Sequence, residues 1–98
     1  MTSKKPTFAT ALRTARVARG LSQEALGELS SRTYVSTLER GLKSPTLHKV
    51  EQFASMLQLH PLTLLVMAYS NSIAAVDVDR AMADVSRDLQ AIRRAAGN

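Results

Sequence analysis

The sequence predicts an all-α protein in two parts: a five-helix domain over residues 1–69, then a linker and one extra helix over residues 70–98. The first observation behind this prediction is that apolar residues recur at helical spacing in almost every segment. The second is that no stretch alternates apolar and polar residues for long, as a half-buried strand would. The third is length, because 98 residues can bury one modest core.

Small polar residues and glycines divide the first part into helices. The predicted helices cover residues 7–19, 23–29, 32–40, 47–58 and a stretch with Pro61 in its first turn. The hydroxyl oxygens of serine and threonine can accept hydrogen bonds from first-turn amides, and the predicted N-caps are Ser22, the Ser30-Ser31 pair and Thr46. Gly20 and Gly41 follow the first and third helices, where a left-handed residue commonly ends a helix.

The core of this part is predicted from the apolar face of each helix. Aliphatic and aromatic residues lie on one side of every predicted helix, and we expect them to meet in the interior. The expected inward residues are Phe8, Leu12, Ala15, Ala25, Leu26, Leu29, Val35, Leu38, Leu47, Val50, Phe53, Ala54, Leu57, Leu62, Leu65 and Val66.

Charge is divided unevenly between the two parts. Residues 1–69 carry nine basic and four acidic side chains and residues 70–98 carry four of each, so the net charge of +5 lies in the first part. A basic surface favours an acidic partner such as nucleic acid.

The absence of cysteine excludes disulfides and thiolate metal sites. The longest apolar stretch, Leu62 to Tyr69, is shorter than the roughly 20 residues of a membrane span, so we expect a cytoplasmic protein.

Two short helices joined by a few residues, inside a basic five-helix domain, are the ingredients of a helix-turn-helix. The segments that sharpen this prediction are 20–26 (GLSQEAL), 32–41 (RTYVSTLERG) and 43–47 (KSPTL). Together they resemble the XRE/Cro/phage-repressor family of DNA-binding domains over about residues 12–65. The resemblance implies a lambda-repressor-like domain in which the 32–40 helix enters the major groove of DNA.

The resemblance also implies roles for single positions. Arg32, Thr33 and Thr37 match the base-reading positions. Arginine can bridge guanine O6 and N7, and threonine offers a hydroxyl and a methyl group that suits thymine. Gln23 matches a glutamine that contacts a phosphate and braces the 32–40 helix. The other residues expected to contact the DNA backbone are Tyr34, Ser36, Lys43 and Ser44.

Two further positions match a structural feature of the family. Arg16 and Glu39 correspond to a partly buried ion pair that ties the first helix to the third.

Several of the implied roles have structural alternatives. Arg32 could contact phosphate only, and Tyr34 could pack on the turn between the motif helices. The Lys4-Lys5 pair could form a basic arm along DNA or a frayed terminus.

The turn between the motif helices departs from the family pattern. The family places eleven positions between the glutamine and the first base-reading residue, whereas Gln23 and Arg32 are nine apart. The turn is therefore shortened to little more than Ser30-Ser31. Leu29 is the candidate for the apolar residue that plugs it.

The second part carries a narrow apolar stripe, which we define as Val78, Met82, Val85, Leu89 and Ile92. Its spacings of 4, 3, 4 and 3 are those of a heptad seam. A helix of about 18–20 residues with such a stripe is marginal alone, so the stripe must pack against something. We expect the same helix of a second chain, giving a homodimer or, with two such pairs, a tetramer. The alternative is a sixth helix folded back on its own domain.

Other functional classes have little support. His48 and His60 lack further ligands at metal-binding spacing and are expected to be surface or capping residues. The chain shows no nucleophile with an adjacent base and no glycine-rich phosphate loop, so we expect neither an enzyme nor a cofactor. Four aromatic residues are too few for an RNA-stacking platform.

The resemblance implies a sequence-specific DNA-binding transcriptional regulator, by analogy a repressor that occludes its site. As a symmetric oligomer it would read an inverted-repeat operator in double-stranded DNA. The alternative is a protein-interaction module, such as an antitoxin-like partner protein, with secondary, autoregulatory DNA binding. The stripe separates the two hypotheses, because a dimer or tetramer covers its own stripe and a monomer exposes it to a missing partner.

Overall fold

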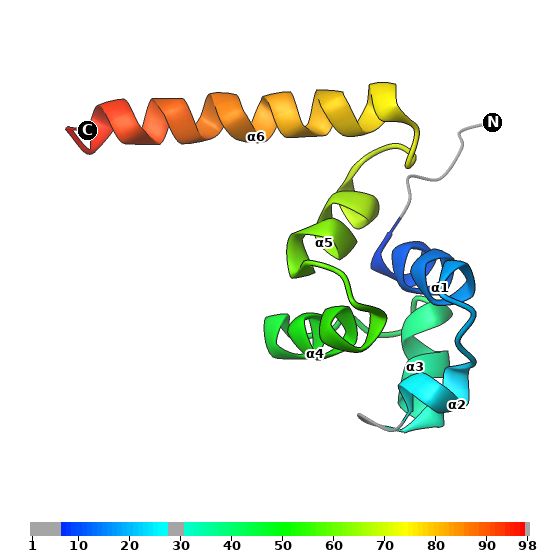
Figure 1. Ribbon diagram of the computed structural model, residues 1–98. Helices are drawn as coiled ribbons and strands as arrows, with labels where there is room; N and C mark the ends of the chain where they lie inside the picture. The colour runs from blue at the N-terminus through cyan, green and yellow to red at the C-terminus, as the bar shows by residue number, and fades with distance from the viewer. Residues whose placement is uncertain (1–6, 28–30, 98) are drawn as a thin grey trace.

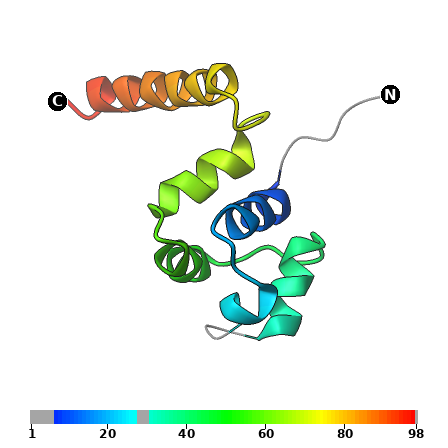
Figure 2. The ribbon, with the colours of Figure 1, turned by 45° about the vertical axis from the view of Figure 1, so that its right-hand side comes forward.

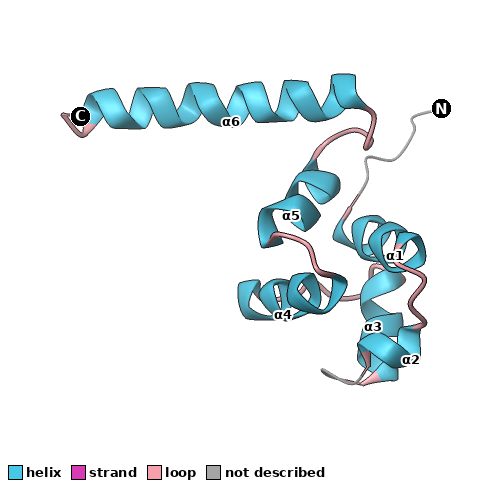
Figure 3. Cartoon of the chain, in the orientation of Figure 1, coloured by secondary structure: helices cyan, strands magenta, loops and turns pink. Residues whose placement is uncertain are grey.

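The computed structural model describes residues 7–27 and 31–97. These residues form six helices and no strand (Figures 1 and 3). The helices are α1 (Phe8–Ala18), α2 (Gln23–Leu26), α3 (Arg32–Glu39), α4 (Leu47–Leu57), α5 (Pro61–Tyr69) and α6 (Ala75–Ala95). This order confirms the predicted all-α class. The ends of α1, α3 and α4 differ from the predicted ranges by one residue. The largest difference is in α2, which ends at Leu26 instead of residue 29.

Helices α1–α5 pack around one apolar core. Helix α1 contacts both α3 and α5, while α4 lies against α5 and α2 against α3 (Figure 2). The largest fully buried side chains are Leu12, Leu26, Val35, Leu38, Phe53, Leu57 and Leu64. Each such side chain contributes about 1.5–3 kcal/mol relative to an exposed one. The core therefore fixes the position of the short helices α2 and α3, which would not be stable alone.

The predicted core was wrong at the starts of α4 and α5. Leu47 is 72% exposed and Leu62 is 60% exposed, because each lies in the first turn of its helix, at the edge of the core. The buried residues of α5 are Leu64 and Ala68. Nearly every residue of α5 is apolar, so its inward face could not be recognised from periodicity.

The starts of α2, α3, α4 and α5 carry side-chain caps, whereas α1 and α6 begin without one. Ser31 Oγ accepts a hydrogen bond from the Tyr34 amide at 3.0 Å and so fixes the first turn of α3. Ser22 and Thr46 cap α2 and α4 in the same way, and His60 Nδ1 accepts from the Leu62 amide at 3.0 Å. A serine or threonine cap of this kind stabilises its helix by about 1 kcal/mol.

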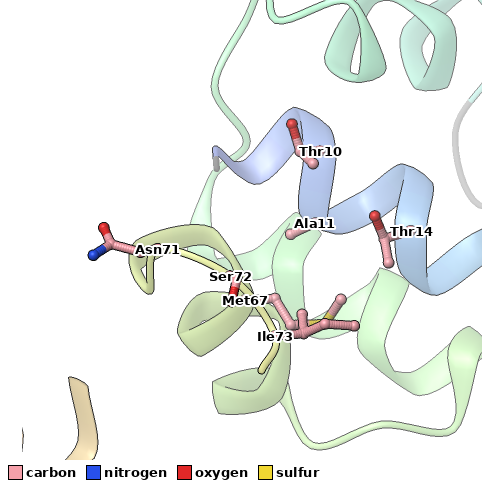
Figure 4. A pocket seen from close by; sticks show the side chains of 7 residues that line it. All are labelled: Thr10, Ala11, Thr14, Met67, Asn71, Ser72 and Ile73. Atoms are coloured by element: carbon pink, nitrogen blue, oxygen red, sulfur yellow. The ribbon is translucent and has the colours of Figure 1, made fainter. Parts of the chain in front are cut away.

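The corner between α5 and α6 is held by hydrogen bonds. Ser70 is buried and donates its hydroxyl to the Ser72 carbonyl at 2.8 Å, and Ser72 in turn donates to Asp77 Oδ2 at 2.6 Å. Beside this corner, Met67 and Ile73 lie against a small pocket of about 260 Å³ that residues of α1 also line (Figure 4). The segment predicted as a linker is thus anchored at both ends.

Helix α6 extends away from the α1–α5 core and contacts it near α5 (Figures 1 and 2). None of its residues is buried. The structure therefore contradicts the alternative in which a sixth helix folds back on its own domain. Within the described ranges, no helix is both long enough and apolar enough to cross a membrane.

Candidate nucleic-acid interface

The orientation of α3 is set by its two buried residues. Val35 and Leu38 face the core and are almost fully buried. At 100° per residue, Thr33, Ser36 and Thr37 then lie on the side of α3 that faces away from the core. This side is the candidate nucleic-acid interface.

A shallow polar hollow of about 290 Å³ lies where α2 begins beside α3. Its lining residues are Gln23, Arg32, Thr33, Ser36 and Arg40. Four of these were site residues in the sequence analysis. Arg40 was not, although it lies one helical turn after Ser36 on the same side of the helix, and that spacing could have identified it.

The two threonines on this face differ in their hydrogen bonding. Thr37 donates its hydroxyl to the Thr33 carbonyl at 2.7 Å, within α3. The hydroxyl proton of Thr37 is therefore used inside the helix, while its oxygen can still accept a bond and its methyl can make an apolar contact. Thr33 is exposed beside Arg32.

Tyr34 packs against α4. Its ring is stacked on Phe53, with centroids 6.5 Å apart and an interplanar angle of 18°, and Lys49 Nζ lies 5.8 Å from the ring centroid. An aromatic pair of this kind contributes about 0.5–1.5 kcal/mol and here joins α3 to α4.

Arg16 and Glu39 form a two-bond ion pair between α1 and α3. Arg16 Nε donates to Glu39 Oε2 at 2.7 Å and Nη2 donates to Oε1 at 2.9 Å, with the side chains 13% and 4% exposed. Gln23 Nε2 adds a third donor to Glu39 Oε1 at 3.0 Å. One carboxylate therefore holds the ends of α1, α2 and α3 together.

The environment shifts the pKa of both members of this pair. Burial acts to raise the pKa of Glu39, but the hydrogen bonds from Arg16 and Gln23 and the nearby arginine charges outweigh it, so the pKa lies below its ordinary value. The hydrogen bond to Glu39 raises the pKa of Arg16. Both groups are therefore charged in the folded protein near neutral pH.

Gly27 allows the close approach of α2 and α3. It is the C-cap of α2, with an ordinary φ of −65°. A Cβ at this position would lie 2.8 Å from the Arg32 backbone nitrogen, closer than real Cβ contacts come. The glycine is needed for space, a role that was not predicted from the sequence. Leu29, the expected plug of the turn, lies outside the described residues.

The remaining predicted site residues are not in the hollow. Lys43 and Ser44 are exposed after α3, and Ser44 lines a separate groove of about 540 Å³ with Phe8, Leu47 and neighbouring residues. Lys4 and Lys5 fall outside the described residues. In the part of the chain that is described, no three acidic or histidine side chains gather as a metal site would require.

The comparisons with known proteins agree with this geometry. The helix-turn-helix domain family matches residues 7–65. Among solved structures, the restriction-modification controller protein C.AhdI from Aeromonas hydrophila is 41% identical, with a TM-score of 0.55, over 58% of this chain and 86% of that chain. The hypothetical transcription factor NHTF from Neisseria is 31% identical, with a TM-score of 0.58, over 66% of this chain and 85% of that chain. A comparison of the sequence with curated proteins found no match. The chain therefore belongs to the helix-turn-helix domain family and is a DNA-binding protein rather than an enzyme.

Proposed function

We propose that this protein is a sequence-specific transcriptional regulator that inserts α3 into the major groove and represses by occluding its site. The observation that carries the proposal is the polar hollow, in which Gln23 at the start of α2 lies together with Arg32, Thr33 and Ser36 of α3. The names of the two similar structures, a controller protein and a transcription factor, support the same class of function. Residues 1–69 would be the DNA-binding domain, and residues 70–98 would set the oligomeric state.

Base reading is assigned to Arg32, Thr33 and Thr37. Arg32 lies at the first turn of α3, where its guanidinium can reach the edge of a guanine. Its Nη1 is 4.0 Å from Glu24 Oε1, but both side chains are largely exposed, and such surface pairs contribute little. Glu24 therefore does not prevent Arg32 from moving to DNA. The hydroxyl oxygen and methyl group of Thr37 and the exposed Thr33 complete the reading face.

Backbone contacts are assigned to residues around the reading face. Gln23 begins α2 and is already held by Glu39, which leaves its amide with a second N–H for a phosphate oxygen. Ser36 and Arg40 border the same hollow, and Arg40 joins the predicted set because its charge lies on this side of α3. Tyr34, Lys43 and Ser44 would contact phosphates at the margin of the interface.

A symmetric oligomer completes the proposal. One helix-turn-helix reads only a half-site, and a dimer that reads two half-sites one helical turn apart gains contact area and specificity. The apolar stripe of α6, none of which is buried, supports association through this helix to a homodimer or tetramer.

The proposal is tested by selecting bound duplexes from a random DNA library at about 0.15 M salt, where a Debye length of about 8 Å screens loose attraction. We expect enrichment of an inverted repeat with half-site centres about 34 Å apart. The control is a Thr33→Ala/Thr37→Ala variant, for which the enriched sequence should change inside the half-sites. Salt-sensitive binding without enrichment would contradict sequence-specific regulation.

A further inference from the structure

We propose that α6 pairs antiparallel with α6 of a second copy of this chain, and that the last turns of each α6 occupy an apolar groove at the α5–α6 corner of the other. This inference takes the oligomer from the proposed function and adds the orientation and the second contact surface. It concerns the protein without DNA. The antiparallel pairing of α6 can therefore be disproved without disproving base reading by α3.

The apolar stripe is the part of α6 that requires a partner. Met82, Val85 and Leu89 are each 49% exposed, and Ile92 is 62% exposed. They follow a heptad-type spacing along a 21-residue helix that buries none of its residues in its own chain. A second α6 is an occupant of matching length and pattern, because each copy carries the same unpaired stripe.

The stripe is nearly symmetric about Val85. Val78 and Ile92 lie seven residues to either side, and Met82 and Leu89 lie three and four residues away. An antiparallel pair centred on Val85 therefore places the partner's Ile92 opposite Val78 and the partner's Leu89 opposite Met82. The two Ala75 residues are then about 30 Å apart, because a helix rises 1.5 Å per residue.

The charges of α6 favour the same orientation. Its first half, up to Asp84, carries three aspartates and one arginine, a net charge of −2. The half after Val85 carries three arginines and one aspartate, a net charge of +2. A parallel pair would place like halves together, whereas an antiparallel pair joins opposite halves. Within α6, Arg87 Nη2 lies 3.2 Å from Asp84 Oδ1, and both side chains are largely exposed. Such a surface pair contributes little, so both charges can also face the opposite half of a partner helix.

The apolar groove at the α5–α6 corner adjoins the apolar stripe of α6. It has a volume of about 460 Å³ and is lined by apolar residues that include Leu62, Val66, Ile73, Val78 and Met82. Val78 and Met82 belong to both the groove and the stripe. The partner's Ile92 and Leu89, placed opposite these two residues, therefore arrive at the groove. Leu62 and Ile73, now 60% and 62% exposed, would be covered.

The orientation is tested by disulfide crosslinking of single-cysteine variants, since the native chain has no cysteine. Val78→Cys and Ile92→Cys chains with tags of different length are mixed, equilibrated and oxidised. We expect a mixed Val78→Cys/Ile92→Cys crosslink, no crosslink of either variant with itself, and a Val85→Cys homodimer. The control is Ala83→Cys, on the opposite side of α6, which should stay uncrosslinked. Self-crosslinking at Val78→Cys would establish a parallel pair, and no crosslink even at Val85→Cys would exclude pairing through α6; either overturns the proposal.

The groove is tested separately by the dimer dissociation constant from sedimentation velocity. We expect Leu62→Arg to weaken the dimer about tenfold or more, because a leucine covered by the partner is replaced by a charge. Val17→Arg is the matched control, since Val17 is also 60% exposed but lies on α1, outside the groove. Equal dimer affinity of the two variants would overturn the groove contact. Circular dichroism of both variants checks that the fold is kept.

Discussion

Helices α3 and α6 are both amphipathic, but the apolar face of α3 is buried in its own chain and that of α6 is not. The 8-residue α3 buries Val35 and Leu38 in the core and is tied by Glu39 to two other helices. The 21-residue α6 buries none of its residues and packs mainly against α5. The shorter helix is thus held firmly by its own chain, as the proposed reading role requires. The longer helix leaves its apolar face exposed in its own chain.

The largest effect is expected at the carboxylate that holds α3. Glu39→Ala leaves Arg16 buried without its partner, which should cost about 3–5 kcal/mol in the free energy of unfolding, measured by urea denaturation. Glu51→Ala, an exposed glutamate of α4, is the control and should have little effect. A loss below about 1 kcal/mol, the range of surface pairs, would show that α3 is not held by this pair.

The same ion pair predicts a dependence of stability on pH. Because the pKa of Glu39 is lower in the folded than in the unfolded chain, its contribution is complete above the unfolded pKa of about 4.3 and is lost as the pH falls through the folded pKa. Glu39→Gln should remove this component of the acid destabilisation. Urea titrations between pH 6 and pH 3 measure it, and an unchanged pH profile would contradict the assignment.

Matched leucine truncations test the comparison directly. Leu38→Ala removes a buried side chain of α3 and should cost about 2–5 kcal/mol at any protein concentration. Leu89→Ala should leave the unfolding free energy of the dilute monomer nearly unchanged and should weaken self-association instead. If both variants destabilise the monomer alike, α6 is packed on its own chain and the comparison fails.

A smaller effect is expected where α2 approaches α3. Gly27→Ala inserts a Cβ 2.8 Å from the Arg32 backbone, and overpacking of this kind costs about 1–3 kcal/mol. Because the clash lies at the start of α3, the proposed reading helix, DNA affinity should fall as well. Ser55→Ala, at an exposed position of α4, is a control for a small substitution outside the motif. Unchanged stability and affinity would contradict the close approach.

The smallest effect is expected at the cap of α3. Ser31→Ala removes the hydrogen bond to the Tyr34 amide and should cost about 1 kcal/mol. Ser55→Ala, an exposed serine within α4, serves as the control in the same denaturation experiment. Equal effects of the two substitutions would indicate that the cap does not stabilise α3.

Most of the fold could be predicted from residue pattern and helix caps. Most of the core residues of α1, α3 and α4 followed from periodicity because polar residues mark the outer faces of these helices, and Leu47 at the start of α4 is the exception. The inward face of α5 could not be recognised, since almost all its residues are apolar. The surface against which α6 packs could not be predicted either. Its apolar stripe shows that the helix needs a partner but does not show which partner it takes.

The candidate site was only partly predictable. The resemblance indicated Gln23, Arg32, Thr33 and Ser36, which the structure brings together. It gave no sign that Gly27 is needed, because that requirement comes from a distance between the backbones of α2 and α3. Tyr34 could be placed against Phe53 only once the packing of α3 on α4 was known.

The most direct test of sequence reading by α3 compares Arg32→Ala with Lys43→Ala on the selected duplex and on a scrambled duplex, across a range of salt. Arg32→Ala should lose about 1–3 kcal/mol on the selected duplex and little on the scrambled one, so that specificity falls. Lys43→Ala should weaken both alike and reduce the salt slope by about 1. Equal losses on both duplexes for Arg32→Ala would contradict the assignment of α3 as the helix that reads the sequence.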